Sequence, residues 1–116
     1  MEANTDFCKV TSIIRCEVLE KVELRLRELG VHGYSVMQVK GCGEYTDFYS
    51  IDCMTTHARI EIFMSAKRAE VIAQAIMDTA HTGLEGDGIV AVLPVYKVFR
   101  IRKRAEIQPD ELYGKA

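Results

Sequence analysis

The chain has 116 residues, of which 48% are hydrophobic and 28% charged, and its formal net charge is −2 at pH 7. This length predicts one domain with a modest core, near the size at which assembly adds useful buried surface. The balanced charge argues against a general electrostatic attraction to nucleic acid. No apolar stretch approaches the roughly 20 residues needed to span a bilayer and no signal peptide opens the chain, so we expect a cytoplasmic protein.

The first half of the chain predicts a strand, a helix and a second strand. Residues 7–15 are rich in β-branched side chains and predict a strand after a loose, polar start. Apolar residues recur at helical spacing over residues 17–29, and Gly30 is the expected end of that helix. Residues 33–40 predict the second strand.

Residues 41–56 break every period and predict a long loop. The segment carries acidic and aromatic side chains, namely Glu44, Tyr45, Asp47, Phe48, Tyr49 and Asp52. Loops longer than about 12–15 residues in a compact domain are usually functional or disordered. We therefore expect a functional role for this loop.

The second half predicts a further strand, helix and strand. Residues 57–64 alternate between apolar and polar side chains, and Ser65 is a good N-cap for a helix that runs to His81. Residues 89–94 are continuously apolar, and residues 95–102 alternate again. The order βαββαβ with a short final strand predicts a ferredoxin-like α+β sandwich. Its sheet would keep one bare face, which must pack on other subunits or bind something flat.

An anion site is predicted where the second helix joins the next strand. Residues 82–88 read Thr-Gly-Leu-Glu-Gly-Asp-Gly, and glycine lets backbone N–H groups approach a phosphate closely. Arg100 and Arg102 lie two residues apart on an expected strand, so both guanidinium groups should project from the same face. Considered alone, glycines in a tight loop more often make only a turn.

The order Thr-Gly-x-x-Gly-Asp-Gly, then a strand, then Arg-Ile-Arg resembles the nucleotide-binding signature of the PII signal-transduction family. The resemblance extends over roughly residues 9–104 and includes Ser12-Ile13-Ile14-Arg15, Val39-Lys40-Gly41-Cys42-Gly43 and Arg59-Ile60-Glu61-Ile62. It implies a single PII-like domain, 1–116, with a folded core at 7–102, a T-loop at 42–56, a B-loop at 82–88 and a C-terminal tail at 103–116. It also implies a homotrimer with nucleotide sites in the inter-subunit clefts, for which an isologous dimer is the alternative on base rates.

The resemblance also implies where an adenine nucleotide would bind. The B-loop and the two arginines match positions that contact the phosphates, Ser35 and Gly41 match positions beside the adenine and ribose, and Phe63 or Met64 would supply an apolar wall. The full set of expected nucleotide-binding residues is Ser35, Gly41, Cys42, Gly43, Phe63, Met64, Thr82, Gly86, Asp87, Gly88, Arg100 and Arg102.

Two departures from the family pattern change the expected ligand. Ile89 replaces the lysine that follows Gly-Asp-Gly, and Glu44 replaces an arginine at the base of the T-loop. Because a charge-assisted hydrogen bond contributes about 1.5–3 kcal/mol, losing the lysine would weaken phosphate binding roughly tenfold to a hundredfold. We expect AMP or ADP to bind at least as well as ATP. The alternative is that Glu44 points into solvent and ATP binds through the arginines alone.

The T-loop departs further from the family. It is shorter, it lacks the Tyr-Arg-Gly-Ala-Glu-Tyr segment that carries the modified tyrosine of some relatives, and Tyr45 replaces a glutamine that helps to hold Mg-ATP and 2-oxoglutarate. Such a chain is similar to PII-like proteins encoded with carboxysomes or bicarbonate transporters. That similarity implies bicarbonate as a second ligand near Lys40 or Arg59, a partner protein in inorganic-carbon metabolism, and a cytoplasmic or carboxysome-associated location.

Catalytic residues, metals and cofactors are not expected. The glycine loop is followed by no Ser or Thr that could hold magnesium, which argues against a phosphoryl-transfer enzyme. His32, His57 and His81 are too scattered to form an evident metal site. Two alternatives stay open: a nitrogen-regulatory PII protein that binds ATP, and an RNA-binding ferredoxin-like domain, which the basic run at residues 100–104 favours but the third strand, without stacking aromatics, does not.

The four cysteines do not predict a zinc site either. Cys8, Cys16, Cys42 and Cys53 have neither Cys-x-x-Cys spacing nor a neighbouring histidine pattern. We expect three of them to be reduced, partly buried thiols. Cys42 and Cys53 bracket a polar loop, which leaves a redox-sensing pair as an open alternative.

Overall fold

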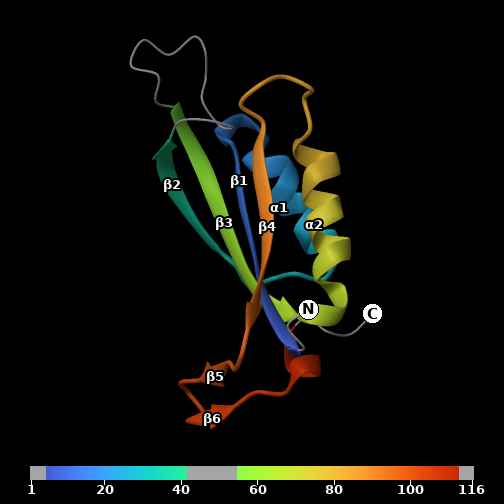
Figure 1. Ribbon diagram of the computed structural model, residues 1–116, viewed down its shortest axis with the longest axis vertical. Helices are drawn as coiled ribbons and strands as arrows, with labels where there is room; N and C mark the ends of the chain where they lie inside the picture. The colour runs from blue at the N-terminus through green and yellow to red at the C-terminus, as the bar shows by residue number, and fades with distance from the viewer. Residues whose placement is uncertain (1–4, 42–54, 113–116) are drawn as a thin grey trace.

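The computed structural model describes residues 5–41 and 55–112 and contains a four-stranded antiparallel sheet (Figure 1). The elements follow one another as β1 (Phe7–Arg15), a 3-10 turn η1 (Cys16–Val18), α1 (Leu19–Glu28), β2 (Ser35–Gly41), β3 (Thr55–Ser65), α2 (Ala66–Ala80), β4 (Gly88–Val95), β5 (Phe99–Arg100), β6 (Ala105–Glu106) and a second 3-10 turn, η2 (Pro109–Glu111). The strand order is β2-β3-β1-β4, with both helices on one side of the sheet (Figure 1). The predicted ferredoxin-like fold is confirmed.

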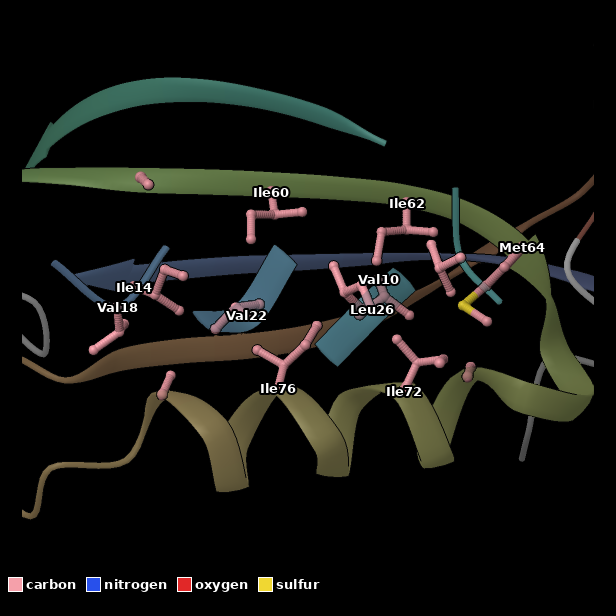
Figure 2. Packing of buried hydrophobic residues seen from close by; sticks show 14 of the residues in the cluster. Val10, Ile14, Val18, Val22, Leu26, Ile60, Ile62, Met64, Ile72 and Ile76 are labelled. Carbon is pink, nitrogen blue, oxygen red and sulfur yellow. The ribbon is translucent and has the colours of Figure 1, made fainter. Parts of the chain in front are cut away.

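The core lies between this sheet and the two helices. Alternate residues of β1 are buried, as a half-buried strand requires, and they meet alternate residues of β3 in register. Figure 2 shows their side chains packed against α1 and α2, and the labelled residues are Val10, Ile14, Val18, Val22, Leu26, Ile60, Ile62, Met64, Ile72 and Ile76. Burying one such side chain contributes about 1.5–3 kcal/mol, so this layer accounts for the orientation of both helices.

The helix boundaries follow from capping chemistry. Ser65 caps α2, as predicted, because its Oγ accepts a hydrogen bond from the Lys67 amide at 3.3 Å. After α1, Gly30 adopts a φ of 88°, and the amides of Gly30 and Val31 donate to the carbonyls of Arg27 and Leu26 at 3.0 and 2.9 Å. This pair of bonds is a Schellman motif, which ends a helix and reverses the chain.

The C-terminal region differs from the expectation. Residues 103–112 were expected as a tail, but β5 and β6 form a hairpin and Ile107 is buried. The amide of Ser65 donates to the carbonyl of Leu112 at 2.9 Å, and the neighbouring amide of Ala66 donates to Asp6 at 2.9 Å. The folded part of the chain therefore continues well past residue 102.

The same hairpin corrects the expected geometry of the two arginines. Arg100 ends β5, whereas Arg102 lies in the turn at residues 101–104, so the two do not alternate along one strand. The turn closes through hydrogen bonds from the amides of Lys103 and Arg104 to the carbonyls of Arg100 and Ile101. The turn contains no glycine or proline. The residue with positive φ is Arg104, at 53°.

The other face of the sheet carries no helix in the described part of the chain, and we call it the open face. Pairing directly across the strands places Lys9, Glu61 and Phe63 on it, together with Ile89 and Leu93 of β4. Lys9 lies 3.3 Å from the Glu61 carboxylate and 6.0 Å from the centre of the Phe63 ring. Neither helix of residues 5–41 and 55–112 has the length and apolar character that a membrane crossing needs.

Candidate functional site

The loop at residues 82–88, which we call the glycine loop, has a shape that depends on its glycines. Gly83, Gly86 and Gly88 adopt φ values of 88°, 93° and 107°, a region that other residues rarely occupy. At Gly88 a side chain is also excluded by contact, because a Cβ there would lie 1.7 Å from the carbonyl oxygen of Ile13. Glycine is therefore required where the loop enters β4.

Asp87 organises the glycine loop from within. Its carboxylate accepts hydrogen bonds from the Thr82 amide at 2.9 Å, the Gly83 amide at 3.0 Å, the Thr82 hydroxyl and the Arg15 Nε at 3.0 Å. Burial alone would raise the pKa of Asp87, but these donors outweigh it and hold the pKa well below its usual range. The prediction that this residue lies at the phosphate site stays a prediction, and its carboxylate is already occupied by the loop itself.

Two residues from the ends of neighbouring strands also hold the loop. The Arg15 Nη2 donates to the carbonyl of Glu85, and the His57 Nε2 lies 2.9 Å from the carbonyl of Gly86. Arg15 and His57 are paired across β1 and β3. Neither residue was predicted to belong to the site, because their proximity depends on strand register and is not visible in the local sequence pattern.

The glycine loop leaves donors available to a ligand. Within residues 5–41 and 55–112, the amides of Glu85 and Gly86 donate to no acceptor, although Gly86 is buried. Buried amides without a partner are rare in folded proteins. Consecutive backbone N–H groups around glycines at positive φ form a concave site for an anion. The arrangement therefore suits a phosphate or another small anion.

The remaining predicted residues separate into two sets at opposite ends of the sheet. Gly41 lies at the end that carries the glycine loop, whereas Ser35 and Phe63 pair with Glu61 and Lys9 farther along the strands. The hairpin with Arg100 and Arg102 lies at the far end of β4 (Figure 1). A strand of this length spans about 23 Å at roughly 3.3 Å per residue, so one chain cannot bring its arginines and its glycine loop to the same phosphate.

Comparisons with known proteins agree with this geometry. Residues 7–105 match the family described as nitrogen regulatory protein P-II. The chain is 36% identical over 102 residues to nitrogen regulatory protein P-II 1 of Methanothermobacter thermautotrophicus, covering 81% of this chain and 88% of that protein. It is 35% identical to nitrogen regulatory protein P-II of Azospirillum brasilense, with 81% and 90% covered. The chain belongs to the PII family.

A solved structure extends this assignment to three dimensions. The crystal structure of Arabidopsis thaliana PII bound to citrate aligns with a TM-score of 0.77 and 31% identity, covering 90% of this chain and 91% of that one. PII proteins are trimeric, ligand-binding regulators that act on partner proteins. The predicted PII membership is confirmed, while the carboxysome- or bicarbonate-associated branch stays a prediction.

The direction of the side chains shows which of the other predicted ligand-binding residues are accessible. Phe63 is half exposed on the open face and is available as an apolar wall, whereas Met64 is fully buried in the core. Lys40 pairs with Thr56 and Arg59 with Met37, which places the two cations on opposite faces of the sheet. They cannot contact one bicarbonate together. Cys42, Gly43, Glu44, Tyr45 and the rest of residues 42–54 lie outside the described residues.

One further feature of this PII protein, a cavity, was not predicted. A cavity of about 330 Å³ lies between α2 and the start of β4, beside the glycine loop, and its walls include Ile76, Met77, Ala80 and Val90. None of the residues expected beside the adenine line it.

Of the cysteines, Cys8 is buried, which raises the pKa of its thiol, and Cys16 is exposed. Among the described residues, no group of three histidine, cysteine or acidic side chains could hold a metal ion.

Proposed function

We propose that this PII protein is a regulator, and not an enzyme, that senses adenine nucleotides through its glycine loop. The observation that carries the proposal is the loop itself: three glycines at positive φ, a carboxylate committed to internal hydrogen bonds, and two amides with no acceptor among the described residues. We assign adenine as the base of the nucleotide because Ser35, Gly41 and Phe63 match the positions that lie beside the adenine in PII proteins.

The proposed site is completed by a second copy of the chain. Arg100 and Arg102 lie too far from the glycine loop of their own chain, so the loop of one protomer and the arginines of its neighbour share each phosphate. Membership of a trimeric family supports this arrangement, as does the apolar surface on the open face, where Phe63, Ile89 and Leu93 are 47%, 43% and 40% exposed. The site thus lies in the inter-subunit cleft.

Within this proposal, AMP and ADP bind at least as well as ATP. Ile89 follows the glycine loop on the open face, at the position for which the PII resemblance implies a lysine, so the cation that would meet an outer phosphate is missing. A charge-assisted hydrogen bond contributes about 1.5–3 kcal/mol, which is roughly a tenfold to hundredfold difference in affinity. Glu44 would add repulsion if it faced the same phosphate.

The proposed output is a partner protein of inorganic-carbon metabolism, contacted through the T-loop. Bicarbonate is the second ligand, held near Lys40 or near Arg59 but not by both, and nucleotide and bicarbonate together bias the T-loop toward the state that presents Tyr45, Phe48 and Tyr49. A ligand shifts such an equilibrium only through different affinities for the two states. The support is the short, altered T-loop sequence.

A second candidate is a nitrogen-regulatory PII protein that binds ATP. The observation in its favour is that the similar proteins from Methanothermobacter and Azospirillum both carry the name nitrogen regulatory protein P-II. In that case Glu44 faces solvent and the neighbour's arginines suffice for the outer phosphate. The two candidates differ in nucleotide ranking and in their response to bicarbonate.

Calorimetric titration with AMP, ADP, ATP and cyclic AMP, each with and without bicarbonate, tests both candidates. The first predicts ADP at least as tight as ATP, and a matched Ile89→Lys variant in which ATP gains about tenfold over ADP. ATP as the tightest ligand, unaffected by bicarbonate, would establish the second. No heat with any of the four would reject nucleotide sensing altogether.

A further inference from the structure

We propose that Arg15 and His57 are positioning residues that clamp the glycine loop in its anion-binding shape. The two side chains lie side by side at the ends of β1 and β3 and hold consecutive backbone carbonyls of the loop, those of Glu85 and Gly86. This inference rests on the proposed nucleotide site and names the residues on which that site depends.

The geometry of the peptide bond explains what the clamp does. In a trans peptide the C=O of one residue and the N–H of the next point in opposite directions, and no cis bond occurs among the described residues. When Arg15 draws the Glu85 carbonyl toward the sheet, the Gly86 N–H must point away from it. His57 holds the Gly86 carbonyl and so fixes the orientation of the next peptide plane. The Gly86 amide, one of the two donors without an acceptor among the described residues, is thereby presented to a ligand.

Arg15 is well placed for this role and poorly placed as a phosphate ligand. Its side chain is only 15% exposed, and its Nε and Nη2 are directed at the Asp87 carboxylate and the Glu85 carbonyl. The planar guanidinium group can hold two acceptors in a fixed orientation, which a lysine cannot reproduce. Arg15 also lies 3.9 Å from Glu17, so an acidic group and the loop already surround it.

His57 supplies the second point of the clamp. It is 1% exposed and its Nε2 is 2.9 Å from the Gly86 carbonyl. Because a carbonyl oxygen only accepts, the Nε2 is the protonated nitrogen in this contact. A glutamine amide can donate from a similar distance along the side chain, whereas phenylalanine fills the space without a donor.

Asp87 provides a test in which two explanations predict opposite signs. If the loop acted only through its charge, Asp87→Asn would strengthen ADP binding, because it removes a negative charge beside the phosphates. If the loop must be held in shape through Arg15 and Asp87, the same substitution weakens binding. Arg15→Gln, His57→Phe and Asp87→Asn are therefore compared with Arg25→Gln, which removes a cation from an exposed pair with Glu28 on α1.

The measurements are ADP affinity by calorimetry and amide hydrogen exchange of residues 82–88 without nucleotide. We expect Arg15→Gln and Asp87→Asn to weaken ADP binding about tenfold or more, and His57→Phe about two- to tenfold, with His57→Gln restoring most of the loss. Exchange in the loop should rise in each weakened variant and stay unchanged in Arg25→Gln. Thermal melts identify any variant that is unfolded at the assay temperature, and His57→Gln and Arg15→Lys then replace the more severe changes.

Unchanged exchange in folded Arg15→Gln and His57→Phe would overturn the clamp, and so would tighter ADP binding by Asp87→Asn. Absence of ADP binding by the unaltered protein would instead reject the proposed function. The exchange measurement still decides in that case whether these two residues hold the loop.

Discussion

The two ends of the sheet are built in different ways. At one end, the glycine loop is held by contacts inside its own chain, through Asp87, Arg15 and His57. At the other end, the hairpin of β5 and β6 leaves Phe99 and Ile101 63% and 92% exposed. The comparison teaches that the shape of the glycine loop is formed within one protomer, whereas in the proposed site the arginines reach a phosphate only through a neighbouring protomer.

The largest expected effect comes from Gly88→Ala, which alters the glycine loop where it enters β4. The new Cβ would meet the Ile13 carbonyl at 1.7 Å in a backbone with φ of 107°, so the loop or β4 must move. We expect a loss of about 3 kcal/mol or more of unfolding free energy in urea, together with loss of ADP binding.

Gly83→Ala is the matched control for that substitution. Gly83 has a φ of 88°, but its nearest neighbour would lie 3.8 Å from the Cβ, so only backbone strain is added. The expected cost is about 1–2 kcal/mol. Equal losses for the two variants would show that the close approach to β1 has no importance.

Mixing two variants tests whether each nucleotide site combines the glycine loop of one protomer with the arginines of its neighbour. We expect Arg100→Gln with Arg102→Gln to weaken ADP binding roughly tenfold to a hundredfold without changing the urea midpoint, because the side chain of neither arginine has a hydrogen-bond or ion-pair partner among the described residues. Gly86→Ala should damage the loop instead, since Gly86 has a φ of 93°. When the two variants are co-assembled, some clefts combine an intact loop with intact arginines, and calorimetry should detect restored sites. No restoration would place both groups in one chain.

Acid tests the contacts of Asp87. Because the pKa of this carboxyl is lowered in the folded chain, its ionised form stabilises the fold above the unfolded value near 4, and that contribution is lost as the pH falls toward the folded value. The unfolding free energy of the unaltered protein should therefore fall more steeply below about pH 4 than that of Asp87→Asn. Parallel curves would mean that the ionised carboxylate gives the loop no net support.

The smallest effect is expected at the hairpin. Lys97 and Glu106 form an ion pair of 3.7 Å whose side chains are 46% and 41% exposed. Such pairs contribute at most about 1 kcal/mol, so Lys97→Gln should leave both the urea midpoint and ADP affinity nearly unchanged. A large loss of stability would show that this exposed ion pair contributes substantially to holding the hairpin.

Local patterns were sufficient for most of the fold. The alternation of residues 57–64, the helical spacing before Gly30 and the cap at Ser65 each predicted the element that forms. The turn at residues 101–104 was missed because an arginine, and not a glycine, takes the positive φ there. Without that signal, the alternation of residues 95–102 reads as one continuous strand.

The site was predicted less completely, because it depends on register and on face. Neighbouring residues of a strand point to opposite faces of the sheet, so Phe63 and Met64 could not both form the apolar wall. Because Met64 is buried in the core, Phe63 is the residue on the open face. The pairing of Arg15 with His57 joins residues 42 positions apart, and only the assembled sheet reveals it.

The bonds at the start of α2 have a practical consequence. Adjacent amides, those of Ser65 and Ala66, donate to the carbonyls of Leu112 and Asp6, so the two ends of the described chain lie next to each other. Chains whose ends meet tolerate circular permutation. A permutant joined there and reopened between Ile101 and Arg102 would keep the glycine loop intact while placing Arg100 and Arg102 at opposite ends of the new chain.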